Sequence, residues 1–200
     1  MTTMYPTTAA TLEYPPTRAS THAHLDERLQ RIEDTEVVNL SPAGQALQRF
    51  ALGHVHWLPG CGFQDGGCWA LAAALHQYLI AHGVGAHLVV AGRPFHIDHV
   101  VVSVSAGGPS PLYLDSDGVG SLSDLSDKLR VLERLPTVTL SPLDERAARH
   151  EGLSDLAELG LVDDLARSLR EAFSDRLARH LRHWPARRAL TRPATLGAHP

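Results

Sequence analysis

A chain of 200 residues, 44% of them hydrophobic, is long enough to bury one core and short enough to form one domain. A net charge of −4 argues against a general nucleic-acid binder, and the lack of any run of 18 apolar residues argues against a membrane span. The N-terminus lacks the basic start and apolar stretch of a secretory signal, so we expect a cytoplasmic protein of bacterial type, or one exported without such a signal.

The N-terminal part is expected to contain a disordered leader and two helices. Residues 1–23 are rich in Thr, Pro and Ala without periodicity, which is typical of disorder. A polar helix is expected over about 24–33. Ser41-Pro42 is typical of an N-cap followed by proline in the first turn and predicts a second helix over about 43–52. The residues that this helix is expected to bury are Leu47, Phe50 and Ala51.

A third helix is expected to begin at Cys68, after the glycine-rich segment 54–67. Its apolar residues recur at i, i+3, i+4, i+7 and i+8, which predicts one buried face, and Gly83 is a natural stop. The residues of this face are Leu71, Ala74, Leu75, Tyr78 and Leu79.

Three apolar, β-branched runs follow, over 86–91, 99–104 and 111–115. The loop 105–110 joins the last two as an antiparallel pair. Residues 24–120 are therefore expected to form an α+β core, in which the helix that begins at Cys68 packs on a small antiparallel sheet.

The region 121–184 is expected to be helical and to pack on this core, and 185–200 to be a disordered tail. Ser123–Leu135 is one candidate helix, and Ser141-Pro142 predicts the start of another. A stripe of Leu and Phe over 161–181 predicts one long helix that ends before Pro185. The stripe fits burial in the core, or a homodimer contact.

Cys68 is the candidate nucleophile. A thiol at the start of a helix faces the free N–H groups and the positive end of the helix dipole, and both favour the thiolate. The other cysteine, Cys61, is close enough for a disulfide across the glycine-rich turn, but a reducing compartment would disfavour that bond. We therefore expect substitution of Cys61 to be mild.

His99 and Asp115 are the candidate base and orienter. His99 opens one strand and is placed to take the thiol proton. Asp115 ends the next strand and is placed to hold the far nitrogen of the imidazole ring. Asp117 is kept as an alternative orienter, although Asp117-Gly118 is also typical of a turn.

These motifs resemble the papain-like cysteine hydrolases. Gly67-Cys68-Trp69-Ala70 is similar to the signature around papain-type nucleophiles, and Gln64 lies where that family keeps an oxyanion-hole glutamine. The short order of Cys, helix, His, strand and Asp is more similar to transglutaminase-like proteins, arylamine N-acetyltransferases and related bacterial toxin or phage enzymes. The arginine before the Cys and the glutamate after it in the acetyltransferases are both missing.

The resemblance implies a cysteine hydrolase with a Cys-His-Asp triad that cleaves a peptide, isopeptide or glutamine side-chain amide through a thioester. Its partner would be a protein or peptide substrate, and no cofactor is expected. Thiol-dependent acyl transfer of the transglutaminase type remains an alternative, as does a non-catalytic binding module with a degenerate papain-like core.

Two other functions compete for some of these residues. His54-Val55-His56 and His96-Ile97-Asp98-His99 are dense in histidine, but no later His or Asp set completes a metal site, so no metal is expected. The C-terminus is rich in arginine, which fits a solvated helix face better than a nucleic-acid contact.

The basic residues are strongly skewed, because Lys128 is the only lysine among the 18 Lys and Arg residues. A GC-rich genome produces such a bias. Selection against lysine, for instance to escape lysine-directed tagging, produces it as well. The sequence leaves both explanations open.

Overall fold

The computed structural model describes residues 37–39, 41–57, 62–63, 66–93, 97–106, 110–132, 134–135, 137–143, 160–184 and 191–193. All of them belong to one compact unit, which spans residues 35–200. The leader 1–23 and the polar helix expected over 24–33 lie outside the described residues.

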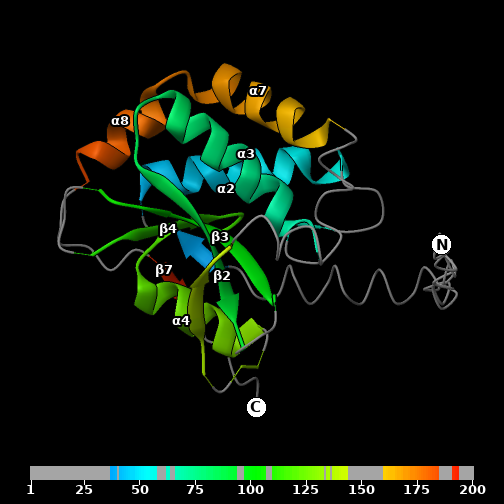
Figure 1. The fold of residues 1–200 in the computed structure, drawn as a ribbon, viewed down its shortest axis with the longest axis vertical. Coiled ribbons are helices and arrows are strands. Elements are labelled where there is room, and N and C mark those ends of the chain that lie inside the picture. Colours follow the sequence, from blue (N-terminus) through cyan, green and yellow to red (C-terminus); the bar gives the residue numbers. More distant parts are fainter. Residues whose placement is uncertain are drawn as a thin grey trace, which may run out of the picture. The chain divides into compact units, whose positions relative to one another are not determined.

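The described elements confirm an α+β fold (Figure 1). The helices are α2 (Pro42–His54), the 3-10 turn η1 (Val55–Trp57), α3 (Cys68–Ala81), α4 (Leu122–Leu132), α7 (Leu161–Phe173) and α8 (Arg176–Arg182). The strands are β1 (Val37–Asn39), β2 (Ala86–Gly92), β3 (His99–Val104), β4 (Leu112–Asp115), β5 (Gly118–Gly120), β6 (Thr139–Pro142) and β7 (Thr191–Pro193).

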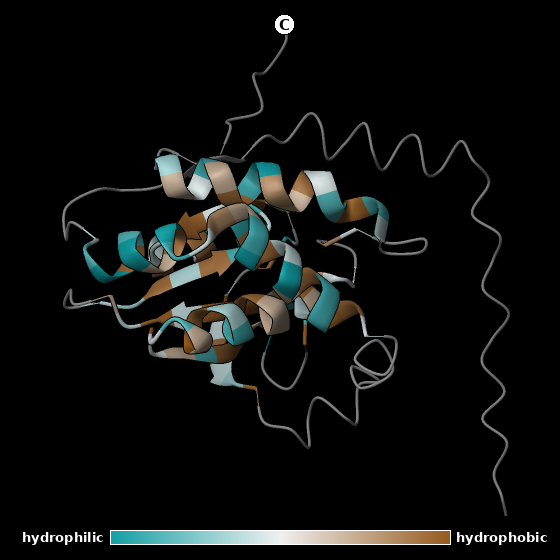
Figure 2. Ribbon diagram, turned by 90° about the horizontal axis from the view of Figure 1, so that it is seen from above, coloured by the Kyte–Doolittle hydropathy of each residue, from teal (hydrophilic) through white to brown (hydrophobic). Residues whose placement is uncertain are grey.

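A five-stranded antiparallel sheet forms the centre of the fold. Its strand order is β5-β4-β3-β2-β6, so β3, which begins at His99, is the middle strand. The strands are mostly brown in Figure 2, whereas the helices mix teal and brown, as expected for a sheet covered on both faces. Helices α2, α3, α7 and α8 contribute to the core on one face, and α4 packs on the other.

Strand β3 shows how the sheet separates these two layers. Val100, Val102 and Val104 belong to the core shared with α3, while Val101 packs with Leu125 and Leu129 of α4. Alternate side chains of a strand point to opposite faces, so both faces of β3 are buried. This explains why the run 99–104 is apolar throughout rather than alternating with polar residues.

Helix α3 is buried around most of its circumference, which corrects the expectation of a single buried face. Besides the expected stripe, Trp69, Ala70 and Ala72 are at most 7% exposed. The helix contacts α7 on one side and β2, β3 and β4 on the other. A helix packed between two layers is apolar on most sides, whereas the i, i+3, i+4 spacing describes a surface helix with only one buried face.

Strand β6 corrects the expectation that Ser141-Pro142 starts a helix. Both residues lie in β6, opposite Val90 and Val89 of β2. Proline is tolerated there because β6 is an edge strand. The region 121–184, expected to be helical, therefore also supplies a strand to the central sheet.

The long helix expected over 161–181 is two helices, α7 and α8, separated at Ser174 and Asp175. Ser174 has a φ of 49°, which ends α7, and its carbonyl oxygen accepts a hydrogen bond from the Tyr78 hydroxyl at 2.8 Å. The stripe continues across the break because both helices pack on the same core. Its residues Leu165, Leu169, Phe173, Leu177 and Leu181 are all buried within this chain.

The tail expected to be disordered contains a strand. Thr191–Pro193 form β7, which pairs with β1 in an antiparallel two-stranded sheet. Pairing between segments more than 150 residues apart leaves no local pattern in the sequence. None of the helices that the structure describes has the length and apolar composition that crossing a bilayer requires.

Candidate functional site

The start of α3 places Cys68 directly after an N-cap residue, Gly67, that has no side chain to cap the helix. Gly67 is the N-cap residue, and its carbonyl oxygen accepts hydrogen bonds from the N–H groups of Ala70 and Leu71. The first N–H groups of a helix have no partner within it, so they are available to a thiolate or a substrate oxygen. Cys68 is a free thiol and is partly exposed.

The N-terminus of α3 lies against the first residues of β3. The His99 side chain and the backbone N–H groups of Val100 and Trp69 lie close enough to the Cys68 sulfur to lower the pKa of its thiol. His99 shares its side of β3 with Val101, the side covered by α4, so alternation alone directs it away from α3. Its position at the very start of the strand lets its ring meet Cys68 as well as the residues on the α4 side.

Asp115, at the end of β4, contacts the same ring. The Nε2 nitrogen of His99 lies 3.1 Å from Oδ2 of Asp115. Since Nε2 faces Asp115, Nδ1 is the ring nitrogen left for Cys68. The structure therefore brings together the three residues singled out from the sequence, Cys68, His99 and Asp115.

The alternative orienter, Asp117, occupies a different position. The register Val102↔Leu114, continued, would place residue 117 opposite His99, but the chain turns at Ser116 and Asp117. The Asp117 backbone N–H donates to Oδ1 of Asp115 at 2.9 Å, and the Asp117 carboxylate lies 2.9 Å from Lys128 Nζ. The turn thus uses Asp117 to hold Asp115 in place.

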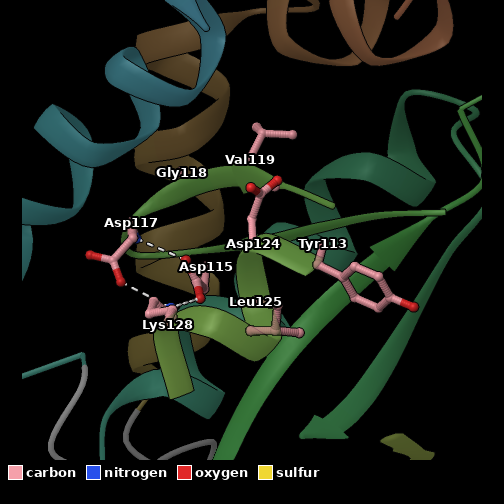
Figure 3. Close-up of a pocket in the computed structure, with 9 residues that line it drawn as sticks. Tyr113, Asp115, Asp117, Gly118, Val119, Asp124, Leu125 and Lys128 are labelled. Atoms are coloured by element: carbon pink, nitrogen blue, oxygen red, sulfur yellow. Dashed lines mark hydrogen bonds and ion pairs between the residues drawn. The ribbon is translucent and has the colours of Figure 1, made fainter. Parts of the chain in front are cut away.

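Lys128, on α4, is a member of the site that the sequence reasoning missed (Figure 3). Its ammonium group donates to Oδ2 of Asp115, the oxygen that also meets His99, and to Oδ2 of Asp117. The Lys128 residue is 6% exposed. The signal that could have found it is its being the only lysine in the chain.

The surroundings of Cys68 and His99 favour a thiolate–imidazolium pair. Burial raises the pKa of the Cys68 thiol, but the His99 hydrogen bond and charge and the two backbone N–H groups outweigh burial, and the pKa is lowered. Burial and the charge of Lys128 lower the pKa of His99, but the hydrogen bonds to Asp115 and Cys68 and the Asp115 charge prevail and raise it to about 9.

The charges of Asp115 and Lys128 stabilise each other. Burial raises the pKa of Asp115, but the Lys128 charge and the His99 hydrogen bond hold it well below its usual range. Burial lowers the pKa of Lys128, but the charges of Asp115 and Asp117 raise it above its usual value. Buried charges persist when each is paired and hydrogen-bonded, as these are.

A second pair of residues fixes the chain just before His99. The Asp98 carboxylate accepts the Arg93 backbone N–H at 2.6 Å and the Arg93 guanidinium at 2.6 Å. Gly92 has a φ of 155°, and a Cβ added there would lie 2.4 Å from an Asp98 oxygen. The close approach of Asp98 to the backbone at Gly92 therefore requires glycine.

Behind the carboxylates, between β4, β5 and α4, lies a small cavity with about 20 Å³ of space for water-sized molecules. Asp115, Asp117, Asp124 and Lys128 line it (Figure 3). Such a space holds about one water molecule, so it does not accommodate a substrate.

Several other candidate residues and interpretations remain to be placed. The oxyanion-hole candidate Gln64, the second cysteine Cys61 and His96 lie outside the described residues. In the part of the chain that the structure describes, no cluster of His, Cys, Asp or Glu is suited to a metal ion. His54 is hydrogen-bonded to the Phe50 carbonyl oxygen at 2.8 Å, in its own helix.

The arginines of α8 are engaged within the chain. Arg179 pairs with Asp175 at 2.9 Å, Arg176 donates to the Ala172 carbonyl oxygen at 2.8 Å, and Arg182 donates to that of His82 at 2.8 Å. These contacts fit a solvated helix face.

The arrangement places a thiol near an imidazole, and the imidazole beside a carboxylate. A helix N-terminus lies beside the sulfur, where a carbonyl oxygen acquires negative charge when its carbon is attacked. These parts are those of acyl chemistry through a thioester. No family model, curated protein or solved structure matches the chain.

Proposed function

We propose that this protein is a cysteine-dependent hydrolase with a papain-like core, which cleaves an amide bond in a protein or peptide substrate. The observation that carries the proposal is the placement of His99 between Cys68 and Asp115: His99 lowers the pKa of the Cys68 thiol, and its Nε2 lies 3.1 Å from Oδ2 of Asp115. The nucleophilic helix on an antiparallel sheet, with the His and the Asp on neighbouring strands, supports the papain-like assignment.

In the first half of the reaction, the Cys68 thiolate attacks the amide carbonyl carbon. The carbonyl oxygen takes up the negative charge and is stabilised by the backbone N–H of Cys68 at the start of α3. The His99 imidazolium then donates its proton to the nitrogen, the C–N bond breaks, and the amine leaves. Cys68 is left as a thioester and His99 is neutral.

In the second half, neutral His99 takes a proton from water, and the resulting hydroxide attacks the thioester carbonyl carbon. The C–S bond breaks and releases a carboxylic acid, which restores the Cys68 thiolate and the His99 imidazolium. Asp115 keeps the ring in one orientation throughout. When the substrate is a glutamine side chain, the leaving amine is ammonia.

The test is alkylation of the protein by iodoacetamide at about pH 6.5, followed by peptide mass spectrometry. An ordinary thiol is about 1% ionised there, so we expect Cys68 to react at least about tenfold faster than free glutathione. The matched controls are Cys61→Ala, which should keep the fast reaction, and Cys68→Ala, which should lose it and retain the fold. Fast labelling at Cys61 instead, or equal and slow reaction at both cysteines, would contradict the proposal.

Product analysis then defines the reaction. Incubation of the wild type and of Cys68→Ala with a denatured protein mixture should give new N-termini or free ammonia only with the wild type. Incorporation of an added primary amine in place of hydrolysis would assign the protein to acyl transfer. If Cys68 is reactive but neither hydrolysis nor amine incorporation is detected, the protein would be assigned a binding role instead.

A further inference from the structure

Lys128 is a buried titratable group in direct contact with Asp115, and the proposed reaction assigns no task to it. It is the only lysine of the chain and is 6% exposed. Its ammonium group donates to Asp115 and to Asp117, so it lies between the carboxylate that orients His99 and the turn that follows (Figure 3). No general need for positive charge explains a lysine here, because every other Lys or Arg position of the chain is an arginine.

We propose that Lys128 is a positioning residue that limits the negative charge which Asp115 presents to His99, so that the imidazolium can release its proton to the leaving amine. The inference rests on the proposed cysteine hydrolase function for its consequence in catalysis. The electrostatic effect itself is a property of the folded protein and is measured without any substrate.

The geometry of Asp115 carries this inference. Its Oδ2 meets both His99 Nε2, at 3.1 Å, and Lys128 Nζ, while its Oδ1 accepts the Asp117 backbone N–H at 2.9 Å. The two cations therefore share one oxygen, and each competes with the other for its charge. A carboxylate with both oxygens engaged cannot rotate away from the imidazole without breaking a buried contact.

The charges around the pair come from several elements. Cys68 of α3 faces His99, and Asp117 of the β4–β5 turn faces Lys128. Asp124 of α4 lines the same cavity as Lys128, but its carboxylate accepts the N–H and the hydroxyl of Ser121 at 2.7 Å each. The charges alternate in sign along the series Cys68, His99, Asp115, Lys128 and Asp117. Each charge is therefore stabilised by the next charge in the series and destabilised by the charge after that.

Removal of the positive charge should therefore hold the proton on His99 more tightly. The Lys128 charge lowers the pKa of His99 at present, and two unneutralised carboxylates would remain without it. Removal of the Asp117 charge should act in the opposite direction, because Lys128 would then neutralise Asp115 alone. A lysine suits this position because an ammonium is a compact point charge, whereas a guanidinium requires more space and a planar arrangement of partners.

The experiment is an NMR titration of the His99 ring in the full chain, with its signal assigned by its loss in His99→Gln. In Lys128→Met we expect the His99 pKa to rise by about one unit, the effect of a full charge within hydrogen-bonding distance of its partner. In Asp117→Asn we expect a smaller shift downward. In the double variant, which lacks both charges, the pKa should lie between that of the wild type and that of Lys128→Met.

The matched control is Arg130→Met, which removes an exposed cation from the same helix and should shift the His99 pKa by less than about 0.2 units. A downward or absent shift in Lys128→Met, or shifts of the same sign in both single variants, would overturn the proposal. If Lys128→Met does not fold, the sign of the Asp117→Asn shift decides. The two proposals can fail independently. If the His99 pKa shifts are as expected but Cys68 is unreactive, the proposed hydrolase function fails and the role of Lys128 stands.

Discussion

The Nε2 nitrogen of His99 lies 3.1 Å from Oδ2 of Asp115, and both side chains are almost completely buried. A buried imidazole loses stabilisation by water, so its protonated form persists only where a fixed anion replaces that stabilisation. The two residues come from adjacent strands, which makes their separation a property of the sheet rather than of a loop.

Asp115→Asn should be much more damaging than Asp117→Asn. Loss of the Asp115 charge removes the group that stabilises the imidazolium, and alkylation of Cys68 by iodoacetamide at about pH 6.5 should fall about tenfold or more, the equivalent of one pKa unit. Asp117→Asn keeps the backbone N–H that holds Asp115, so the rate should change less than about threefold. Circular dichroism of both variants serves as the folding control. A greater loss of reactivity in Asp117→Asn would show that Asp117, and not Asp115, orients His99.

The pH dependence of stability should reveal the buried imidazolium. The folded pKa of His99, about 9, is raised above the ordinary value of 6.5, so its contribution is complete below about pH 6.5 and is lost as the pH rises through about 9. The free energy of unfolding of the wild type, measured against that of His99→Gln by urea denaturation, should therefore decrease between these values. A difference that is constant from pH 6 to 10 would show that His99 is not held protonated.

The pH dependence of thiol reactivity should be unusual for the same reason. Since the pKa of Cys68 is lowered, alkylation should stay fast well below pH 8.5, where a free thiol slows. In His99→Gln the rate should follow an ordinary thiol curve, because burial then acts without the imidazolium. A series of rate constants from pH 5 to 10 for the two proteins makes the comparison, and coinciding curves would argue against the ion pair.

Gly92→Ala should disturb the site from a distance. The added Cβ would lie 2.4 Å from an oxygen of Asp98, the residue just before His99. Asp98 must then move, which loosens its hydrogen bond with the Arg93 backbone N–H. We expect a several-fold slower alkylation of Cys68 with little loss of helix content. The control is Gly85→Ala, at the position just before β2, the strand that ends at Gly92. No atom lies within 4 Å of the new Cβ there, so the rate should not change.

Leu169→Ala should destabilise the fold. Leu169 of α7 is fully buried against the core, and such a truncation costs about 2–5 kcal/mol of unfolding free energy. Ile80→Ala, at a position 51% exposed, should cost less than about 1 kcal/mol. Neither effect should depend on protein concentration, because the stripe is buried within one chain. A concentration-dependent melting temperature would support a homodimer contact instead.

Short-range patterns in the sequence determined much of the α+β core. The glycine-rich segment before Cys68, the apolar spacing that follows and the β-branched run from His99 each act over a few residues, and each predicted an element that the structure contains. The contacts expected between the Cys68 helix and the two strands follow from this order, since a hairpin brings neighbouring strands side by side.

Tertiary structure decided what depends on contacts between distant segments. Ser41-Pro42 and Ser141-Pro142 carry the same local signal, yet the first caps α2 through a hydrogen bond from the Gly44 N–H, and the second lies in β6, where the open edge of β2 pairs with it. The role of Lys128 emerges in the same way, because a lysine becomes part of a site only when folding buries it against Asp115. Hydrogen bonds to a sheet edge and the pairing of buried charges outweigh local propensity, and neither is visible until the chain has folded.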